Sequence, residues 1–276
     1  MNDAYAPKYQ YADIKTGIKI SYVELGKMDE RPIVFLHGAT DSYLSFSQMA
    51  PKTAAFGYRV IVPELRGHGQ SDKPLGSLYT IETHTADIHA LLTMLNICDA
   101  HIVGHSLGSF VAQKLAAEHS ELVSSITLIG SAETLTENPV LEWLLEGDEE
   151  FEGINHVSSL PDDFLIDWAA SSNKDTIFIQ KTFDHAKALP IEIWRSVFGG
   201  AASSCFADPS DITVPVQIIY GTDDIFFSKE LQMELIAQLG SDSIHFVKKN
   251  GAGHNTHWEG NLGEEIAEDI VRFLKN

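Results

Sequence analysis

Short, mostly apolar runs alternate with longer amphipathic segments along most of this 276-residue chain. Strands that are buried on both faces of a parallel sheet lose the alternation of inward apolar and outward polar residues. Five runs fit this description, and they are PIVFL (32–36), YRVIV (58–62), AHIV (100–103), SITLI (125–129) and VQIIY (216–220). The segments between them are long enough for helices, so the pattern predicts strands joined by helices in a mostly parallel sheet.

Apolar residues spaced three and four apart predict three of the connecting helices, at Ile81 to Leu95, directly after Ser106, and at Leu262 to Leu274. The pattern also predicts strands at both ends of the sheet. The two segments around Thr16-Gly17 form an edge hairpin, and the segment SIHFVKK (243–249) forms a last strand. The predicted fold class is therefore α/β, with a mostly parallel, eight-stranded twisted sheet that carries helices on both faces.

Residues 133–211 interrupt the alternation of strands and helices. Three short helices are predicted there, and they are marked by Asn138–Leu145, Phe164–Trp168 and Ile191–Phe198. Asn138 and Pro139 are a typical helix start, and Gly199-Gly200 is expected to end the third helix. We therefore expect an inserted helical cap at 133–207, between two core segments at 1–132 and 208–276.

The chain is strongly acidic, with 39 Asp and Glu against 19 Lys and Arg and a formal net charge of −20. This charge repels phosphate backbones and anionic lipids, so we expect no nucleic-acid or membrane partner, and small partners that are neutral or cationic. The segment 133–211 holds 16 acidic and four basic residues, which is 12 of the 20 net negative charges. Some of these carboxylates could filter substrates by charge, and most are interpreted as a solvated surface.

Sequence features that would indicate secretion, a membrane span or a metal site are weak. Cys98 and Cys205 match neither a disulfide framework nor metal-ligand spacing. The N-terminus lacks a basic segment followed by an apolar run, and no apolar run approaches the ~18 residues of a membrane span. We expect a cytoplasmic enzyme without a cofactor, either a monomer or a homodimer.

The segment Gly104-His105-Ser106-Leu107-Gly108 has the form G-x-S-x-G and lies between a predicted strand and a predicted helix. A sharp turn at this place strains the serine backbone, and the two glycines leave room for the crossing chain. The Ser106 hydroxyl would then project at a helix N-terminus, where developing negative charge is stabilised. The alternative, a serine that only caps the helix, explains the strand-to-helix context less well.

A serine nucleophile needs a base, and the base needs a carboxylate that orients it. Asp223 and Asp224 directly follow one predicted strand, and His254 follows the last one. The chain order Ser, Asp, His is the expected one for a strand-turn-helix nucleophile. Asp223 and Asp224 are both candidates for the acid.

At this point the chain resembles the cap-bearing serine hydrolases of the α/β-hydrolase fold superfamily, in the group of esterases and meta-cleavage product hydrolases. The matching segments are VFLHG (34–38), PELRGHGQSDKP (63–74), VGHSLG (103–108), YGTDD (220–224) and GAGHNTHWE (251–259). The resemblance implies that Ser106 is the nucleophile, Asp224 the acid and His254 the base. Asp223 and Glu133 remain as alternatives for the acid. It also implies an oxyanion hole formed by the amides of Ala39 and Leu107.

Further residues are candidates for substrate contacts, although core packing explains the aromatic ones equally well. They are Gly38, His105, Tyr43, Trp143, Trp168, Trp194 and His257. His257 could also form a metal pair with His254, but two histidines without a third ligand are weak evidence, so no metal site is predicted. Other histidines, His84 among them, are assigned to solvated faces or satisfied local contacts.

The expected reaction is hydrolysis of a small or medium carboxylic ester or lactone, neutral or weakly polar, through an acyl-enzyme on Ser106. The elbow serine distinguishes this chain from the haloalkane dehalogenases and epoxide hydrolases of similar architecture, which use aspartate. Carbon-carbon hydrolysis of the meta-cleavage type is one alternative. Its anionic substrates conflict with the acidic insertion unless Arg195 compensates, and Asn255 stands where that group usually has Trp. A cofactor-free perhydrolase and a ligand receptor remain as further alternatives.

Overall fold

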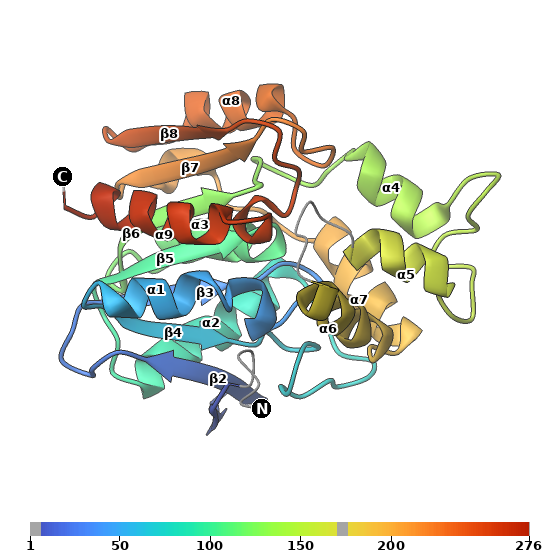
Figure 1. Cartoon of the computed structure of the whole chain (residues 1–276), viewed down its shortest axis with the longest axis horizontal. Coiled ribbons are helices and arrows are strands. Elements are labelled where there is room, and N and C mark those ends of the chain that lie inside the picture. Colours follow the sequence, from blue (N-terminus) through green and yellow to red (C-terminus); the bar gives the residue numbers. More distant parts are fainter. Residues whose placement is uncertain (1–6, 170–175, 276) are drawn as a thin grey trace.

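The computed structural model describes residues 7–169 and 176–275, and within them eight strands form a single sheet (Figure 1). The sheet order is β1-β2-β4-β3-β5-β6-β7-β8. The strands are β1 (Tyr9–Asp13), β2 (Lys19–Leu25), β3 (Pro32–Leu36), β4 (Arg59–Pro63), β5 (Ala100–His105), β6 (Val123–Ile129), β7 (Val216–Gly221) and β8 (Ile244–Lys249). The pairs β1–β2 and β2–β4 are antiparallel, and all other pairs are parallel.

The predicted strands are all present in the sheet. In β3, Ile33 to Leu36 are fully buried, which is why this run shows no alternation of polar and apolar residues. The hairpin of β1 and β2 lies at one edge, as predicted, and β8 forms the other edge with mostly exposed or half-buried residues. The prediction of a mostly parallel α/β sheet is confirmed.

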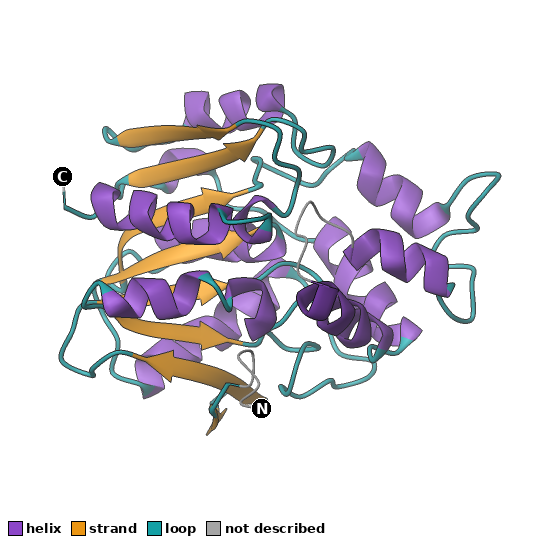
Figure 2. Ribbon diagram, viewed as in Figure 1, coloured by secondary structure: helices purple, strands orange, loops and turns teal. Residues whose placement is uncertain are grey.

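Helices cover both faces of the sheet (Figure 2). They are α1 (Met49–Ala55), α2 (Ile81–Met94), α3 (Leu107–Glu118), α8 (Lys229–Gln238) and α9 (Leu262–Phe273). Helices α1 and α9 pack against each other on one face, and α2 and α3 pack against each other on the opposite face (Figure 1). The apolar core is accordingly split into two large clusters, one on each side of the sheet.

Along the described chain, four further helices follow β6 and precede β7. They lie next to the end of the sheet at which β5 leads into Ser106 (Figure 1). They are α4 (Pro139–Glu146), α5 (Asp162–Ala169), α6 (Thr176–Lys187) and α7 (Ile191–Ala202). Asn138 caps α4 as predicted, because its Oδ1 accepts from the amides of Val140 at 3.1 Å and Leu141 at 3.0 Å.

Two features of this helical segment differ from the sequence analysis. The helix α6 was not predicted at all. The expected end of α7 at Gly199-Gly200 is wrong, since the helix continues to Ala202. Gly200 serves close packing instead, because a Cβ there would lie 2.5 Å from the carbonyl oxygen of Tyr79.

The longest helix is α2, with 14 residues. None of the helices in residues 7–169 and 176–275 combines the length and the apolar character needed to cross a membrane.

Candidate active site

Ser106 stands at the sharp turn between β5 and α3. Its backbone has φ 50° and ψ −119°, a strained conformation for a residue with a side chain. The turn is possible because of the flanking glycines. A Cβ on Gly104 would lie 2.3 Å from the carbonyl oxygen of Gly108, and a Cβ on Gly108 would lie 2.1 Å from that of Leu36. The G-x-S-x-G segment therefore adopts the geometry of a strand-to-helix elbow, with Ser106 at its tip.

Asp224 and His254 come together from the loops that follow β7 and β8. His254 Nδ1 lies 3.1 Å from Asp224 Oδ2 and 3.2 Å from Oδ1. The Asp224 side chain is fully buried, and its Oδ1 also accepts from the amides of Phe226 at 2.8 Å and Phe227 at 3.1 Å. These bonds fix the orientation of the carboxylate. Both Ser106 and His254 line the same cavity.

Gly130, directly after β6, makes room for this pair. Its φ is +55°, and a Cβ at this position would lie 3.1 Å from His254 Nδ1 and 3.2 Å from Asp224 Oδ2. Gly130 was not among the predicted site residues. The available signal was a glycine immediately after a predicted strand, next to the edge where Ser106 lies.

Neither alternative acid is hydrogen-bonded to His254. Asp223 is exposed and its Oδ1 accepts from the hydroxyl of Thr222 at 2.8 Å. Glu133 accepts a hydrogen bond from the side chain of Gln238 at the surface. Asp224 is thus the carboxylate that the fold brings to His254.

The two amides predicted to form an oxyanion hole flank the elbow. Ala39 follows β3 and lines the cavity, and Leu107 is the first residue of α3. Neither amide is hydrogen-bonded to an acceptor in the part of the chain that the structure describes. His37 braces the loop, since its Nε2 accepts from the amide of Leu65 at 3.0 Å and its Nδ1 donates to Gly38 O at 2.8 Å.

The cavity has a volume of about 640 Å³. Four of the seven residues predicted to contact substrate line it, namely Gly38, His105, Trp143 and Trp168. The other three do not: Tyr43 packs into the core below the elbow loop, while Trp194 and His257 are fully buried. Their positions are those of core residues, which was the alternative interpretation of the aromatic ones.

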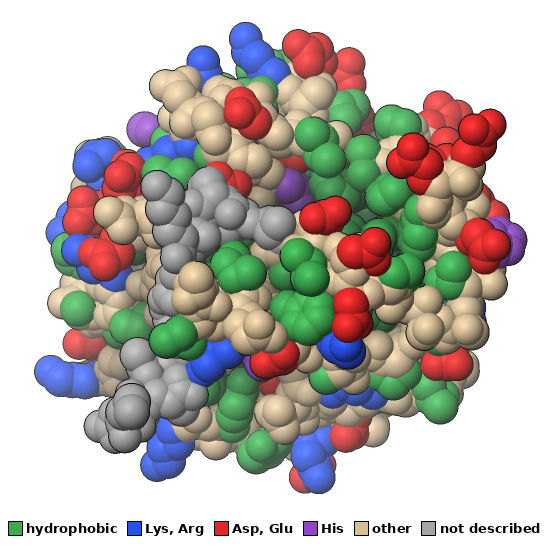
Figure 3. All heavy atoms as spheres, turned by 45° about the vertical axis from the view of Figure 1, so that its right-hand side comes forward, with side chains coloured by type: hydrophobic (Ala, Val, Ile, Leu, Met, Phe, Trp, Pro, Cys, Tyr) green, Lys and Arg blue, Asp and Glu red, His purple; other side chains and the backbone are tan. Residues whose placement is uncertain are grey.

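Acidic side chains surround the cavity. Its lining includes seven carboxylates, Asp41, Asp148, Glu150, Asp163, Asp167, Asp223 and Glu259, and the described lining contains no Lys or Arg. Figure 3 shows an apolar hollow on this face of the molecule, bordered by Asp and Glu side chains. The concentration of negative charge in residues 133–211 therefore extends to the cavity itself.

Comparison with known proteins agrees with this geometry. A family model described as alpha/beta hydrolase fold matches residues 31–261. The chain belongs to the α/β-hydrolase fold family.

Relatives of this α/β hydrolase cover nearly its whole length. It is 27% identical to the AB hydrolase superfamily protein YfhM of Bacillus subtilis, over 94% of this chain and 96% of the relative. It is 26% identical to 2-hydroxy-6-oxononadienedioate/2-hydroxy-6-oxononatrienedioate hydrolase 2 of Pseudomonas putida, over 98% of each. An esterase from Exiguobacterium antarcticum superimposes with a TM-score of 0.83 at 19% identity, over 98% of this chain and 100% of that one. The relatives are hydrolases, and the structural match shows the shared fold.

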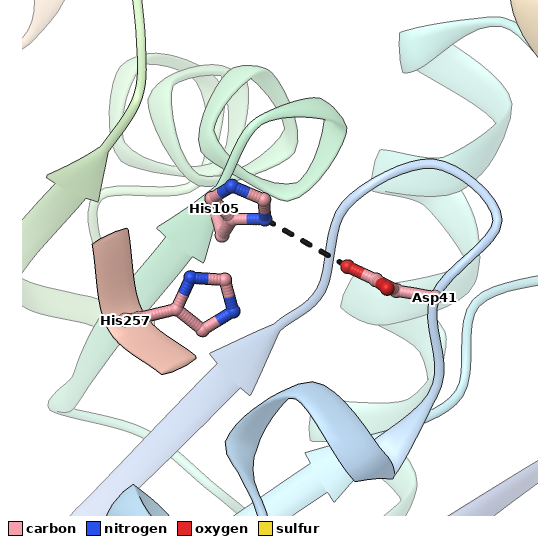
Figure 4. A group of neighbouring side chains, drawn as sticks. All are labelled: Asp41, His105 and His257. Atoms are coloured by element: carbon pink, nitrogen blue, oxygen red, sulfur yellow. Dashed lines mark ion pairs between the residues drawn. The ribbon is translucent and has the colours of Figure 1, made fainter. Parts of the chain in front are cut away.

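Beside the elbow, the hydrolase buries a group of titratable side chains, Asp41, His105 and His257 (Figure 4). His105 Nε2 donates to the backbone oxygen of His254 at 3.1 Å, and its Nδ1 faces Asp41 Oδ2 across 3.9 Å. Burial raises the pKa of Asp41 to about 8 and lowers the pKa of His257 to about 3. At neutral pH these groups are therefore mostly uncharged.

The donor atoms of Asp41, His105 and His257 are of kinds that bind Zn²⁺. Ligand atoms of tetrahedral zinc lie only about 3.4 Å apart at the usual bond lengths. The 3.9 Å between His105 and Asp41 is wider, so both side chains would have to move. The possible pair of His254 and His257 does not form either, because His254 faces Asp224 while His257 packs against His105 and Phe46. We assign no metal here.

The prediction for His84 is wrong. This side chain is fully buried behind the RGHG turn rather than solvated, and neither ring nitrogen has a hydrogen-bond partner among residues 7–169 and 176–275. Its ring lies 6.1 Å from that of Tyr79 and 6.4 Å from that of His68. Its position in the first turn of α2, four residues before the buried Ile88, was the signal for burial.

Proposed function

We propose that this α/β hydrolase cleaves a small or medium carboxylic ester or lactone through an acyl-enzyme on Ser106. The observation that carries the proposal is the Asp224–His254 pair, because the carboxylate is buried while its partner imidazole lines the same cavity as the strained Ser106. A base oriented by a carboxylate, beside a serine at a helix N-terminus, is the arrangement that activates a hydroxyl for acyl transfer.

In the proposed reaction His254 Nε2 takes the hydroxyl proton as Ser106 Oγ attacks the carbonyl carbon. The negative oxygen of the tetrahedral intermediate accepts from the amides of Ala39 and Leu107. His254 then gives the proton to the departing alcohol, and the acyl group stays on Ser106. Water, deprotonated by His254, attacks this ester and releases the acid. Asp224 holds the imidazole in the required tautomer and stabilises its charged form throughout.

The carbon-carbon hydrolase alternative is less well supported, because its substrates are anionic. The cavity lining has no Lys or Arg within the described residues. Arg195, the cation that could have compensated, donates from Nε to the carbonyl of Ile154 at 2.7 Å and from its other end to Val157 O. Its guanidinium is therefore used to hold the loop after α4 and does not line the cavity.

A panel of p-nitrophenyl esters from acetate to palmitate, run on the wild type and on Ser106→Ala, tests the proposal. We expect turnover on at least one chain length and a loss of about 10⁴-fold or more in kcat for Ser106→Ala. A fluorophosphonate probe should label Ser106 in the wild type only. If no ester is turned over faster by the wild type than by the variant, the esterase proposal is wrong. Peracid formation from acetate and peroxide would then favour the perhydrolase, and slow turnover with tight binding would favour the receptor.

A further inference from the structure

The cavity has an aromatic wall that begins at His254 and extends outward. The ring of Phe226 lies 4.7 Å from that of His254, and Trp168 lies 6.2 Å from Phe226. Trp168 in turn is stacked with Phe164 at 6.0 Å, and Phe164 with Phe151 at 4.8 Å. One small substrate can therefore contact this wall at one end and the reacting atoms of Ser106 and His254 at the other.

The helix α5 places two carboxylates on this wall. Asp163 and Asp167 are one helical turn apart and alternate with Phe164 and Trp168, and all four residues line the cavity. Both carboxylates are exposed, and neither forms an ion pair with any described residue. Asp162, their neighbour, is exposed as well, but it pairs with Lys187 at 2.6 Å and does not line the cavity.

The loop after α4 continues the wall and also combines carboxylates with aromatic residues. Asp148 Oδ2 accepts from the indole of Trp143 at 2.8 Å, and its Oδ1 accepts from the amides of Glu150 at 2.9 Å and Phe151 at 3.0 Å. These bonds hold the segment that presents Glu150 and Phe151 to the cavity. Carboxylates thus alternate with aromatic residues both on α5 and in the loop after α4.

Carboxylates alone attract any cation without selecting one. Ring faces add selectivity, because the negative face of Trp or Phe attracts an alkylammonium group whose methyl groups also bury apolar surface. An anionic substrate would meet only like charges here, and a purely apolar one would gain nothing from the carboxylates. The lining therefore fits a ligand that is both cationic and apolar.

We propose that the substrate ester carries an alkylammonium group. This inference rests on the proposed ester hydrolysis. The ammonium group lies against Phe164 and Trp168, between Asp163 and Asp167, while the ester carbonyl reaches Ser106.

The test compares esters that differ only in charge. One pair is butyrylcholine and the ester in which a tert-butyl group replaces its trimethylammonium group. A second pair of p-nitrophenyl esters carries the same two groups at the end of the acyl chain. At low ionic strength we expect kcat/KM on the order of tenfold higher for the cationic member of at least one pair, since cation–π and exposed ion contacts together contribute about 1–2 kcal/mol. The preference should shrink in high salt, because the Debye length falls from ~30 Å at 0.01 M to ~3 Å at 1 M.

Variants locate the effect on α5. In Asp163→Asn and Asp167→Asn, the ratio of kcat/KM for the cationic and neutral members should fall about two- to fivefold each. The matched control Asp162→Asn should keep the wild-type ratio, because that carboxylate lies outside the cavity.

The possible results separate the two proposals. If both neutral esters are hydrolysed as fast as the cationic ones or faster, the alkylammonium proposal is wrong and ester hydrolysis stands. An unchanged ratio in both α5 variants would likewise overturn it. If neither member of either pair is hydrolysed and the chain-length panel is also silent, the proposed function itself fails.

Discussion

At the scale of single residues, three glycines make the arrangement around Ser106 possible. Gly104 and Gly108 allow the elbow to turn, and Gly130 leaves the space that His254 and Asp224 occupy. The first two were predictable because they belong to a local motif between a strand and a helix. Gly130 was not, because its role depends on side chains more than 90 residues away in the chain, from the loops after β7 and β8.

The Gly130→Ala variant should impair catalysis more than stability. The new methyl group would lie 3.1 Å from the imidazole of His254 and displace it, and misplacement of about 1 Å costs on the order of 10²-fold in rate. We expect kcat to fall by about 10²-fold in the ester assay, with a destabilisation of about 1–2 kcal/mol from the positive φ.

Gly199→Ala is the matched control for this variant. Gly199 lies within α7, and a Cβ there meets no atom within 4 Å. Activity should be retained, and the free energy of unfolding should rise by about 0.5–1 kcal/mol. A Gly130→Ala enzyme with kcat within twofold of the wild type would contradict the assigned role of this glycine.

The two neighbouring aspartates should differ sharply. Asp224→Asn removes the carboxylate that orients His254, and the corresponding change in a serine protease triad costs about 10⁴ in kcat. Asp223→Asn alters an exposed side chain that is bonded to Thr222, so kcat should stay within about threefold. Steady-state kinetics on the best ester of the panel measures both. An equal loss in the two variants would mean that Asp224 has no special role.

Sequence spacing does not show in which direction a side chain points, so it predicted only some of the residues that line the cavity. His257 is three residues from His254, yet the short 3-10 helix Thr256–Trp258 turns it away from the cavity, toward Phe46. Trp194 and Tyr43 are aromatic residues near the site, but their burial depends on how distant elements pack. Residue type and spacing identify candidates, whereas lining a cavity is a property of the whole fold.

At the scale of elements, the amphipathic pattern predicted six of the described helices and did not specify α1, α6 or α8. Helix α6 (Thr176–Lys187) begins TIFI, with β-branched and aromatic residues that favour strands as much as helices. Helix α7 runs through Gly199-Gly200 because Gly200 is needed for contact with the backbone of Tyr79. A glycine pair at the end of an apolar pattern therefore marked close packing here rather than a helix end.

Asn138 should matter beyond the cap of α4. Its Oδ1 caps the helix, and its Nδ2 donates to the carbonyl of Phe226 at 2.9 Å, which links α4 to the loop that carries Asp224. Asn138→Ala loses both interactions, so urea unfolding should show a loss of about 1–2 kcal/mol. Asn138→Asp keeps the cap and loses only the link, so its loss should be smaller. Equal stability of all three proteins would show that neither bond stabilises the fold.

At the scale of the whole molecule, six of the twelve histidines are buried, and burial favours their neutral form. Burial lowers the pKa of His37 to about 4 and those of His68, His101 and His257 to about 3. In the unfolded chain the same imidazoles titrate near 6.5. Between these values the unfolded state binds more protons than the folded state, so stability falls as the pH is lowered from about 6.5 to 4. The raised pKa of Asp41, about 8, acts in the opposite direction and offsets part of this effect.

The contribution of one histidine can be isolated in β5, far from the elbow. His101 is fully buried between the hydroxyls of Ser125 at 2.8 Å and Thr127 at 2.9 Å. In His101→Gln the slope of unfolding free energy against pH, between pH 6.5 and 4, should decrease by up to about 1.4 kcal/mol per pH unit. The exposed His156, replaced by Gln, serves as the control and should leave the slope unchanged. Urea titrations at several pH values measure both, and identical slopes in all three proteins would contradict the assignment.

The alternation of strands and helices was predictable along the chain because each central strand is a continuous apolar run. The order of the strands in the sheet was not, since nothing in the local pattern of β3 and β4 says that β4 pairs with β2. The excess of acidic over basic residues in 133–211 can be counted in the sequence. That several of these carboxylates line a cavity with aromatic residues depends on how α4 and α5 pack in the folded chain.

A hydrogen bond joins α5 to the loop after β3: the indole Nε1 of Trp168 donates to Thr40 Oγ1, next to Ala39, at 2.8 Å. Any outward movement of α5 must break this bond and expose the indole to water. Because Trp168 is one of four tryptophans, outward movement of α5 should shift only part of the protein's fluorescence to longer wavelength. Ligand exchange could then be followed in real time without an added dye.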